Sequence, residues 1–133
     1  METLRLPIIL LMIFFSTQSS LAQQPTAWQN AFYKSYEAET NEKYTAAINE
    51  LMNVYKADDY FINLRLGWLN YLARQHTKSE QYYRTAIRLK PYSIEARFGV
   101  VKPLSATAKW DQVKLQYLEI LKIDPNNTVA SYW

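Results

Sequence analysis

Two stretches of this 133-residue sequence end in the same way, YRTAIRLKP at residues 83–91 and YLEILKIDP at residues 117–125. A 34-residue period relates Tyr83 to Tyr117 and Pro91 to Pro125. An earlier copy follows a 32-residue period, so that Tyr44 corresponds to His76. Self-similarity at a fixed period of roughly 20–50 residues is typical of stacked repeat proteins, in which each unit buries its apolar face only against its neighbours. The sequence therefore predicts repeats near 26–59, 60–93 and 94–127, and the start of a further helix at 128–133.

Hydrophobic residues recur at helical spacing within each repeat, and residues that form tight turns are scarce. The chain contains only two glycines, Gly67 and Gly99, and five prolines, which leaves little turn chemistry for a fold built from strands. Two amphipathic helices in each repeat fit the pattern. We expect helices near 26–40, 43–57, 60–74, 78–90, 94–106 and 110–123.

Signals for helix ends support several of these boundaries. A Thr followed three residues later by Glu or Gln has the spacing of a capping box, and proline is common just beyond a helix end. The signals are Thr26 with Gln29, Thr77 with Glu80, Asp59 and Ser93 as N-caps, and Pro91 and Pro125 after helix ends. Pro103 falls inside the fifth helix, and we expect it to kink or shorten that helix because its ring removes a backbone hydrogen bond.

A set of residues repeated across the copies carries a resemblance to a known family. The set comprises Leu66-Gly67, the ring that opens each second helix (Tyr44, His76 and Trp110), Tyr83 with Ala86 and Ile87, and the endings at Pro91 and Leu121–Asn127. In these residues the sequence is similar to the tetratricopeptide repeat (TPR) family, over roughly residues 26–133. The resemblance implies an all-α fold, a right-handed superhelical stack of antiparallel helix pairs with about three repeats, and a non-catalytic scaffold for protein–protein interaction. The third copy departs from the pattern at Val100-Val101, where the family prefers Leu-Gly.

The helix expected at 60–74 is apolar on more than one side. A helix of this kind is either buried on two sides or exposes an apolar groove. In the stack that the resemblance implies, the first helix of each copy lines the concave side. In the next copy, Glu95, Phe98 and Lys102 correspond to Phe61, Leu64 and Trp68 by the 34-residue period. We hypothesise a peptide-binding groove on this side, formed by Phe61, Leu64, Arg65, Trp68, Tyr71, Phe98 and Lys102.

The aromatic members of this set have a second interpretation. Phe61, Trp68 and Tyr71 are equally suited to the core between two repeats, since large aromatic side chains are often buried. The two interpretations differ in what truncation of Trp68 would do. Truncation of a groove residue would remove binding alone, whereas truncation of a core residue would unfold the stack.

Residues for catalysis, metal binding or cofactor binding form no recognisable pattern. Cysteine is absent, which removes disulfides, thiol nucleophiles and Cys-ligated metals. The single histidine, His76, aligns with Tyr44 and Trp110, so we interpret it as a ring packed at the turn between two helices rather than a catalytic or metal-binding group. The sequence has no glycine-rich phosphate loop and no alternating oxygen ligands for calcium. We therefore expect no enzymatic activity, no metal and no cofactor.

The segment 1–22 has the composition of an export signal. A short stretch with Arg5 precedes ten apolar residues from Leu6 to Phe15, and Ser20-Leu21-Ala22 offers small residues for cleavage. This pattern is typical of a secretory signal peptide cleaved after Ala22. Ten apolar residues span about 15 Å as a helix, which is too short for a stable transmembrane anchor. We expect an exported protein, periplasmic or secreted, with no stable membrane span once the signal is cleaved.

Charge is unevenly distributed, but it forms no dense basic run. Residues 23–59 contain three Lys or Arg against six Asp or Glu, and residues 60–133 contain eleven against five. Because no basic cluster is present, we expect a protein or peptide partner and not a nucleic acid.

The short stretch at 128–133 has two interpretations. Either it covers the last helix pair, or the chain is the N-terminal repeat fragment of a larger envelope enzyme or a transport or assembly protein.

Overall fold

The computed structural model describes residues 24–133, and the signal peptide expected at residues 1–22 lies outside the described residues. Between residues 24 and 133 the chain forms helices and no strand. None of the helices in this range is long and apolar enough to cross a membrane. The helices are α1 (Ala27–Thr40), α2 (Tyr44–Met52), α3 (Tyr60–Leu72), α4 (His76–Leu89), α5 (Ile94–Ala106), α6 (Trp110–Ile123) and α7 (Thr128–Ser131).

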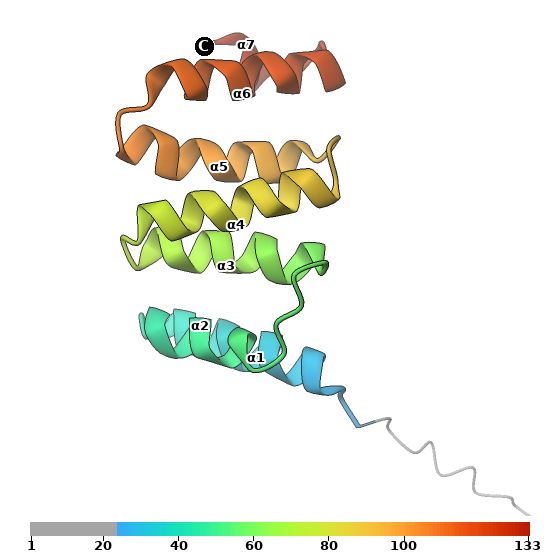
Figure 1. Ribbon diagram of the computed structural model, residues 1–133, viewed down its shortest axis with the longest axis vertical. Coiled ribbons are helices and arrows are strands. Elements are labelled where there is room, and N and C mark those ends of the chain that lie inside the picture. The colour runs from blue at the N-terminus through green and yellow to red at the C-terminus, as the bar shows by residue number, and fades with distance from the viewer. Residues whose placement is uncertain (1–23) are drawn as a thin grey trace, which may run out of the picture.

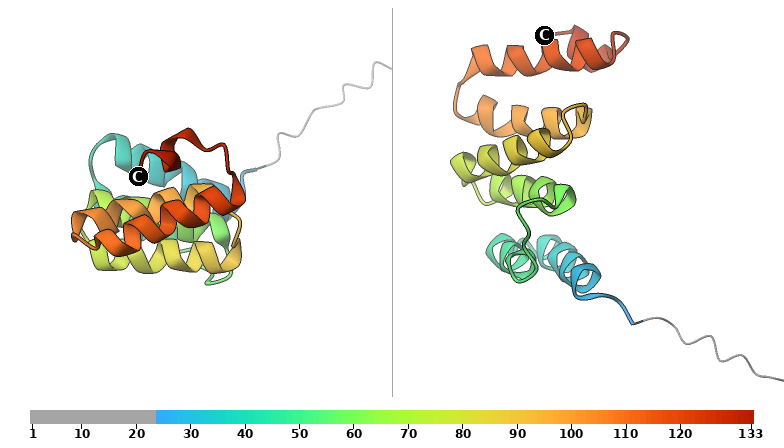
Figure 2. Two further views of the ribbon diagram at one scale, coloured as in Figure 1. Left: turned by 90° about the horizontal axis from the view of Figure 1, so that it is seen from above. Right: turned by 45° about the vertical axis from the view of Figure 1, so that its right-hand side comes forward.

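Consecutive helices run in opposite directions and pack as pairs, α1 with α2, α3 with α4 and α5 with α6 (Figure 1). The pairs follow one another along the long axis of the molecule, as the additional views in Figure 2 also show. Helix α5 packs against both α3 and α4, and α7 packs against α6. Each pair thus buries its apolar side against the next, as stacked repeats must. The all-α stack of antiparallel helix pairs predicted from the sequence is confirmed.

The turn inside each pair has the same geometry. Its central residue is left-handed, with φ of 57° at Glu42, 59° at Arg74 and 55° at Ala108. In each case the next residue donates its backbone N–H to a carbonyl five residues earlier, as Gln75 does to Asn70 at 2.8 Å. This bond satisfies a carbonyl at the end of the first helix. The second helix then begins at the following residue, so the turn rather than a side-chain cap fixes where α2, α4 and α6 start.

This turn explains which predicted caps are present. Thr26 and Gln29 form the expected capping box, and the side chains of Asp59 and Ser93 cap α3 and α5. The capping box predicted at Thr77 and Glu80 is wrong, because α4 begins at His76 and its N-cap makes no side-chain hydrogen bond. The Glu80 carboxylate instead accepts hydrogen bonds from Lys109 (2.7 Å) and Arg84 (2.8 Å), which links the second pair to the third.

The second helix is shorter than the sequence predicts. The pattern predicts a helix over 43–57, but α2 ends at Met52 and has 9 residues, against 14 in α4 and in α6. The chain after Met52 is held by Asn63 of α3, whose side-chain amide donates to the carbonyls of Ala57 (3.2 Å) and Asp59 (2.8 Å). These bonds fix the connection so that Asp59 lies where it caps α3. This copy is two residues shorter than the next, so a second helix of 14 residues, as in α4 and α6, would leave too few residues to reach this cap.

Of the two outcomes expected for Pro103, a kink or a shorter helix, the shorter helix is wrong, because α5 keeps its full expected length. The helix continues through the proline to Ala106, and the proline ring is buried. Only the bond to the carbonyl of Gly99 is forfeited. The carbonyl of Pro103 itself accepts from the backbone N–H (3.1 Å) and the hydroxyl (2.9 Å) of Thr107, so the last turn of the helix remains hydrogen-bonded.

The ring of Tyr83 joins three helices. It projects from α4 and is buried between Gly67 of α3 and Gly99 of α5. A Cβ atom on Gly67 would lie 2.8 Å from the ring, and one on Gly99 would overlap it. Both glycines of the chain are therefore needed for close contact with the same ring, that of Tyr83. Beside this ring, the hydroxyl of Ser79 donates to the carbonyl of Gly67 at 2.7 Å, which fixes α4 against α3.

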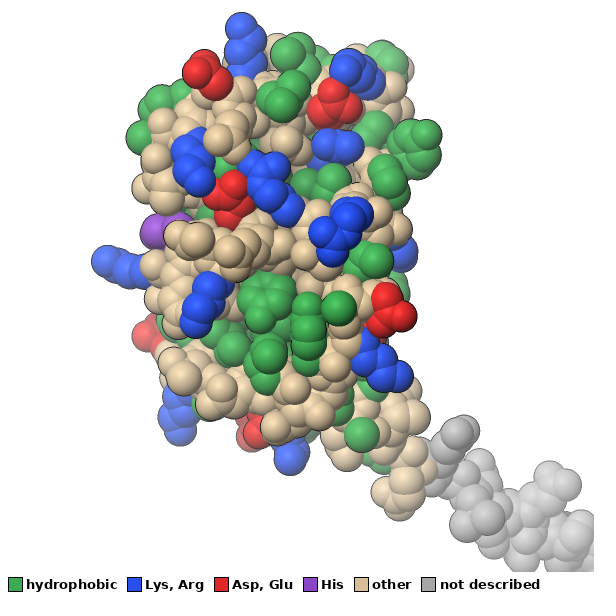
Figure 3. Space-filling view, viewed as in Figure 1, with side chains coloured by type: hydrophobic (Ala, Val, Ile, Leu, Met, Phe, Trp, Pro, Cys, Tyr) green, Lys and Arg blue, Asp and Glu red, His purple; other side chains and the backbone are tan. Residues whose placement is uncertain are grey.

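The first pair meets the second through aromatic and sulfur contacts on one side of the molecule. The ring of Tyr82 in α4 lies edge-on to Tyr55 at 6.1 Å between centroids, and its hydroxyl contacts the sulfur of Met52 at 3.7 Å. Figure 3 shows apolar side chains gathered on one face at the level of α2 and α3. Lys and Arg side chains on the same face are interspersed with Asp and Glu, and they form no continuous basic strip.

The segment expected to start a further helix forms the short α7. Its Ala130 is buried, and Trp133 stacks on Tyr117 of α6 with ring centroids 5.2 Å apart and an angle of 6° between the planes. Val129 and Tyr132 remain exposed. The segment thus covers part of α6 and also adds apolar surface of its own.

We predict that Gly99→Ala destabilises the stack by about 1–3 kcal/mol because the new methyl group overlaps the Tyr83 ring. In a Tyr83→Leu background the same change should become neutral or stabilising by up to about 1 kcal/mol, since alanine is the better helix former once the ring is gone. Urea unfolding of the four proteins in this cycle measures both values. An equal loss of stability in the two backgrounds would show that the ring is not what excludes a side chain at residue 99.

Candidate functional site

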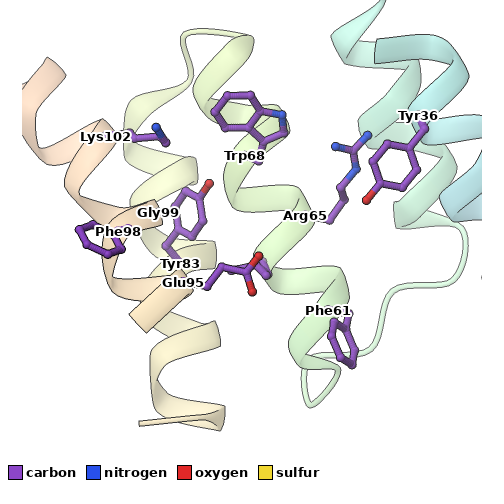
Figure 4. Close-up of a pocket in the computed structure, with 10 residues that line it drawn as sticks. Tyr36, Phe61, Arg65, Trp68, Tyr83, Glu95, Phe98, Gly99 and Lys102 are labelled. Carbon is purple, nitrogen blue, oxygen red and sulfur yellow. The ribbon is translucent and has the colours of Figure 1, made fainter. Parts of the chain in front are cut away.

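A groove of about 530 Å³ lies between α3 and α5, with contributions from α1 and α4. Its rim is exposed at Tyr36, Phe61, Glu95 and Lys102. Figure 4 shows the side chains of α3 and α5 facing each other across it, with Tyr83 between them. The groove, called here the α3–α5 groove, is lined by Tyr36, Phe61, Leu64, Arg65, Trp68, Tyr83, Glu95, Phe98, Gly99 and Lys102.

Six of the seven residues expected to form a peptide groove line this cavity; Tyr71 does not. The Tyr71 ring lies further along α3, 5.9 Å from the ring of Trp68 and 5.8 Å from that of His76. His76 thus lies against another ring at the turn between two helices, as the sequence predicts. No metal-binding group of three or more His, Cys, Asp or Glu residues occurs among residues 24–133.

Four lining residues were outside the expected set, and they differ in how far the sequence could reveal them. Glu95 occupies the position of Phe61 in the next copy, so the repeat spacing already indicated it. Gly99 and Tyr83 line the groove because the glycine places no side chain between the buried ring and the groove. Tyr36 comes from α1, whose register relative to the later copies the spacing does not define. Tyr36 lines the groove only because α1 packs against α3.

The floor of the groove is the phenol of Tyr83. Burial, together with the negative charge of Glu95, raises the pKa of Tyr83 above its ordinary value, so the hydroxyl stays protonated at neutral pH. This hydroxyl makes no hydrogen bond to another residue within 24–133. Figure 4 shows it pointing into the space between α3 and α5. It is therefore a hydrogen-bond donor available to a ligand.

One wall is formed by the indole of Trp68, and Lys102 lies across from it. The Lys102 ammonium is 5.6 Å from the centre of the Trp68 ring, within the range of a cation–π contact. Trp68 is half-buried and packs against the core on both sides of α3. Phe61, in contrast, is 53% exposed. Of the three rings with two interpretations, Phe61 belongs to the surface and Trp68 is partly core, while Tyr71 is half-buried beside Trp68 and His76.

Arg65 does not present its charge to the groove in the way the sequence suggested. Its side chain is only 8% exposed and forms an ion pair with Glu39 of α1 at 2.5 Å. The guanidinium also lies 3.7 Å from the centre of the Tyr36 ring, and its Nε donates to the hydroxyl of Ser35 at 3.2 Å. The same Glu39 accepts from the indole N–H of Trp68 at 2.6 Å. Arg65 and Trp68 thus hold α1 to α3, and both the charge of Arg65 and the indole N–H already have a partner.

The sequence matches no model of a protein family, and no curated protein matches it. Among solved structures, the chain is similar to the second TPR domain of the human RPAP3 protein, determined by NMR in complex with an HSP70 peptide. The superposition has a TM-score of 0.70 and covers 80% of this chain and 90% of that chain, at 14% sequence identity. At this identity the likeness shows the fold alone. The chain has a TPR-like fold.

We predict that Glu39→Gln lowers the free energy of unfolding by about 1–3 kcal/mol, because it leaves the buried Arg65 guanidinium without its counter-charge. Glu37→Gln is the matched control, since Glu37 lies on the same helix, is exposed and makes no ion pair within residues 24–133. Urea unfolding monitored by tryptophan fluorescence measures the difference. Equal stability of the two variants would mean that this ion pair does not anchor α1.

Proposed function

We propose that this protein is an interaction module that holds a peptide segment of a partner protein in the α3–α5 groove, on the concave side of the stack, and performs no chemistry of its own. The observation that carries the proposal is an exposed groove lined by five aromatic rings, those of Tyr36, Phe61, Trp68, Tyr83 and Phe98. Aromatic side chains in open grooves provide contact area at low entropic cost, and they are frequent anchors of protein interfaces. A TPR-like fold typically serves as a non-catalytic interaction domain, and the human neighbour was determined with a peptide bound.

The chemistry of the groove supports a peptide over a small metabolite. Its lining offers rings, one phenol donor and two charges without an ion-pair partner within residues 24–133, Glu95 and Lys102. Charge-bearing rims around an apolar floor suit a segment that buries apolar side chains and keeps its polar groups at the edge.

Binding should depend on Phe61, the exposed ring of the groove. We predict that Phe61→Ala weakens binding of apolar peptides about 5- to 30-fold, the effect of removing one interface anchor of roughly 1–2 kcal/mol. Because Phe61 is exposed, the melting temperature should change little. The measurement uses end-blocked synthetic peptides selected from a random pool against the wild-type protein, with the indole N–H resonance of Trp68 reporting contact.

The matched control is Tyr92→Ala. Tyr92 is 83% exposed and lies outside the groove, so its removal should leave affinity unchanged. Wild-type affinity in the Phe61 variant would contradict the proposed site. Selected peptides that leave the Trp68 resonance unshifted would place binding elsewhere on the protein.

We further propose that the module acts outside the cytoplasm, in the periplasm or as a secreted protein. The support is the sequence of residues 1–22, with Arg5, the apolar Leu6–Phe15 and the small residues before Gln23. Export would place the groove where it meets segments of other envelope or secreted proteins.

Expression of the full chain with a C-terminal tag tests this location. We expect the exported fraction to contain a protein that begins at Gln23, identified by intact mass. A Leu10→Arg variant, with a charge in the apolar segment, should remain unprocessed and inside the cell. A wild-type chain that keeps Met1 and stays in the cytoplasm would show that residues 1–22 are not an export signal.

A further inference from the structure

Two charges of opposite sign lie along the same side of the α3–α5 groove. Glu95 and Lys102 both belong to α5, both line the cavity, and both are exposed. They are seven residues apart, which is two helical turns or about 10.5 Å along the axis. Figure 4 shows them separated along α5, with Tyr83 between them.

Neither charge has an ion-pair partner within residues 24–133. Lys102 faces the ring of Trp68, and the nearby Glu39 is already bound to Arg65 and Trp68. Glu95 shares a neighbouring hollow with Lys90. The Lys90 ammonium, however, lies over the rings of Tyr60 (4.2 Å) and Phe61 (4.6 Å) and not within ion-pair distance of the carboxylate. The groove thus has one basic end and one acidic end.

The rings between these ends suit an extended segment better than a helix. A polyproline II segment is thinner, and aromatic-lined grooves are its usual binding surface. Its backbone makes no internal hydrogen bonds, so its carbonyls need donors, and the Tyr83 hydroxyl is one that is available.

The spacing of the two charges matches this conformation. In polyproline II, residues three apart lie on the same side of the segment at about 9.3 Å, close to the separation of Glu95 and Lys102 along α5. Resting on the proposed peptide binding, we infer that the groove recognises a proline-rich segment in polyproline II conformation, with an acidic side chain paired to Lys102 and a basic side chain paired to Glu95, three positions apart.

The test uses the full chain and end-blocked peptides of one length with a central pair of prolines. Three peptides differ only in the flanking charges: acidic and basic, both acidic, or both basic. The wild-type protein should bind the mixed peptide about 10-fold more tightly than either same-charge peptide, because each same-charge peptide replaces one attractive charge pair by a repulsive one. Fluorescence anisotropy gives the three dissociation constants.

Charge reversal in the groove should change this order predictably. Lys102→Glu should make the doubly basic peptide the tightest ligand, and Glu95→Lys should do the same for the doubly acidic one. Lys114→Glu is the control, because it changes the net charge as Lys102→Glu does, but Lys114 is exposed on α6 and does not line the groove; the mixed peptide should remain preferred. Tyr83→Phe should weaken all three peptides about 5-fold, since it removes only the donor.

The outcomes separate this inference from the proposed function. Equal binding of the three proline-rich peptides, or a preference that Lys114→Glu alters as much as Lys102→Glu, would overturn the charge assignment and leave peptide binding intact. Tighter binding of a helical, proline-free peptide with its charges seven positions apart would overturn the polyproline II assignment alone. Failure of every peptide, including those selected from the random pool, to shift the Trp68 resonance would reject the groove as a peptide site altogether.

Discussion

The stack depends on how closely α3 and α5 can approach the ring of Tyr83. Two glycines allow that approach, one on each helix, and neither can take a side chain without displacing the ring. The second glycine, Gly99, lies two residues before the position at which the third copy has Val101 in place of the Leu-Gly pattern. On α5 the close contact with the Tyr83 ring is therefore made at Gly99, two residues before Val101. Because Gly99 places no side chain between Tyr83 and the groove, the residue that fixes the spacing of the helices also leaves the phenol of Tyr83 as the floor of the groove. A single packing contact thus sets both the stability of the stack and the shape of its open surface.

The two interfaces between helix pairs differ in the interactions that stabilise them. The second and third pairs share a continuous apolar core around Tyr83, Val100, Leu104 and Ile120. The first pair joins the second partly through polar side chains, with Glu39 accepting from both Arg65 and Trp68. A buried ion pair gives little net stabilisation, but its two groups must stay in contact because breaking the pair leaves a buried charge without a partner. The position of α1 relative to α3, and with it the place of Tyr36 on the groove rim, is therefore set by this ion pair together with the apolar cluster that Ala31 shares with α3.

Periodicity predicted the helices well because each helix must bury a stripe at helical spacing whatever its partner. It failed where a contact between distant residues decides the outcome. Helix α2 stops at Met52 because Asn63 holds the following chain, and no local signal at 53–57 reveals this. The capping box at Thr77 and Glu80 was wrong because the repeated left-handed turn at Arg74 starts the helix earlier. For the groove, the 34-residue spacing relates Leu64 to Phe98 and Phe61 to Glu95, and all four residues line the same cavity. Tyr36 depended on the packing of α1, which spacing does not encode.

Arg65 shows why a set of charged residues in a sequence does not describe the charge that a ligand meets. Arg65 and Lys102 are the two charged residues in the groove expected from the sequence, and both are basic. In the structure its guanidinium is enclosed by Glu39, Ser35 and Tyr36, so its charge is neutralised inside the protein. Lys102 is thereby left as the basic group that lines the groove without an ion pair, and Glu95 becomes its counterpart at the other end of α5. The folded groove therefore has one basic end and one acidic end, although the charged residues expected from the sequence were both basic. A groove of this kind can favour one orientation of a charged segment over the other.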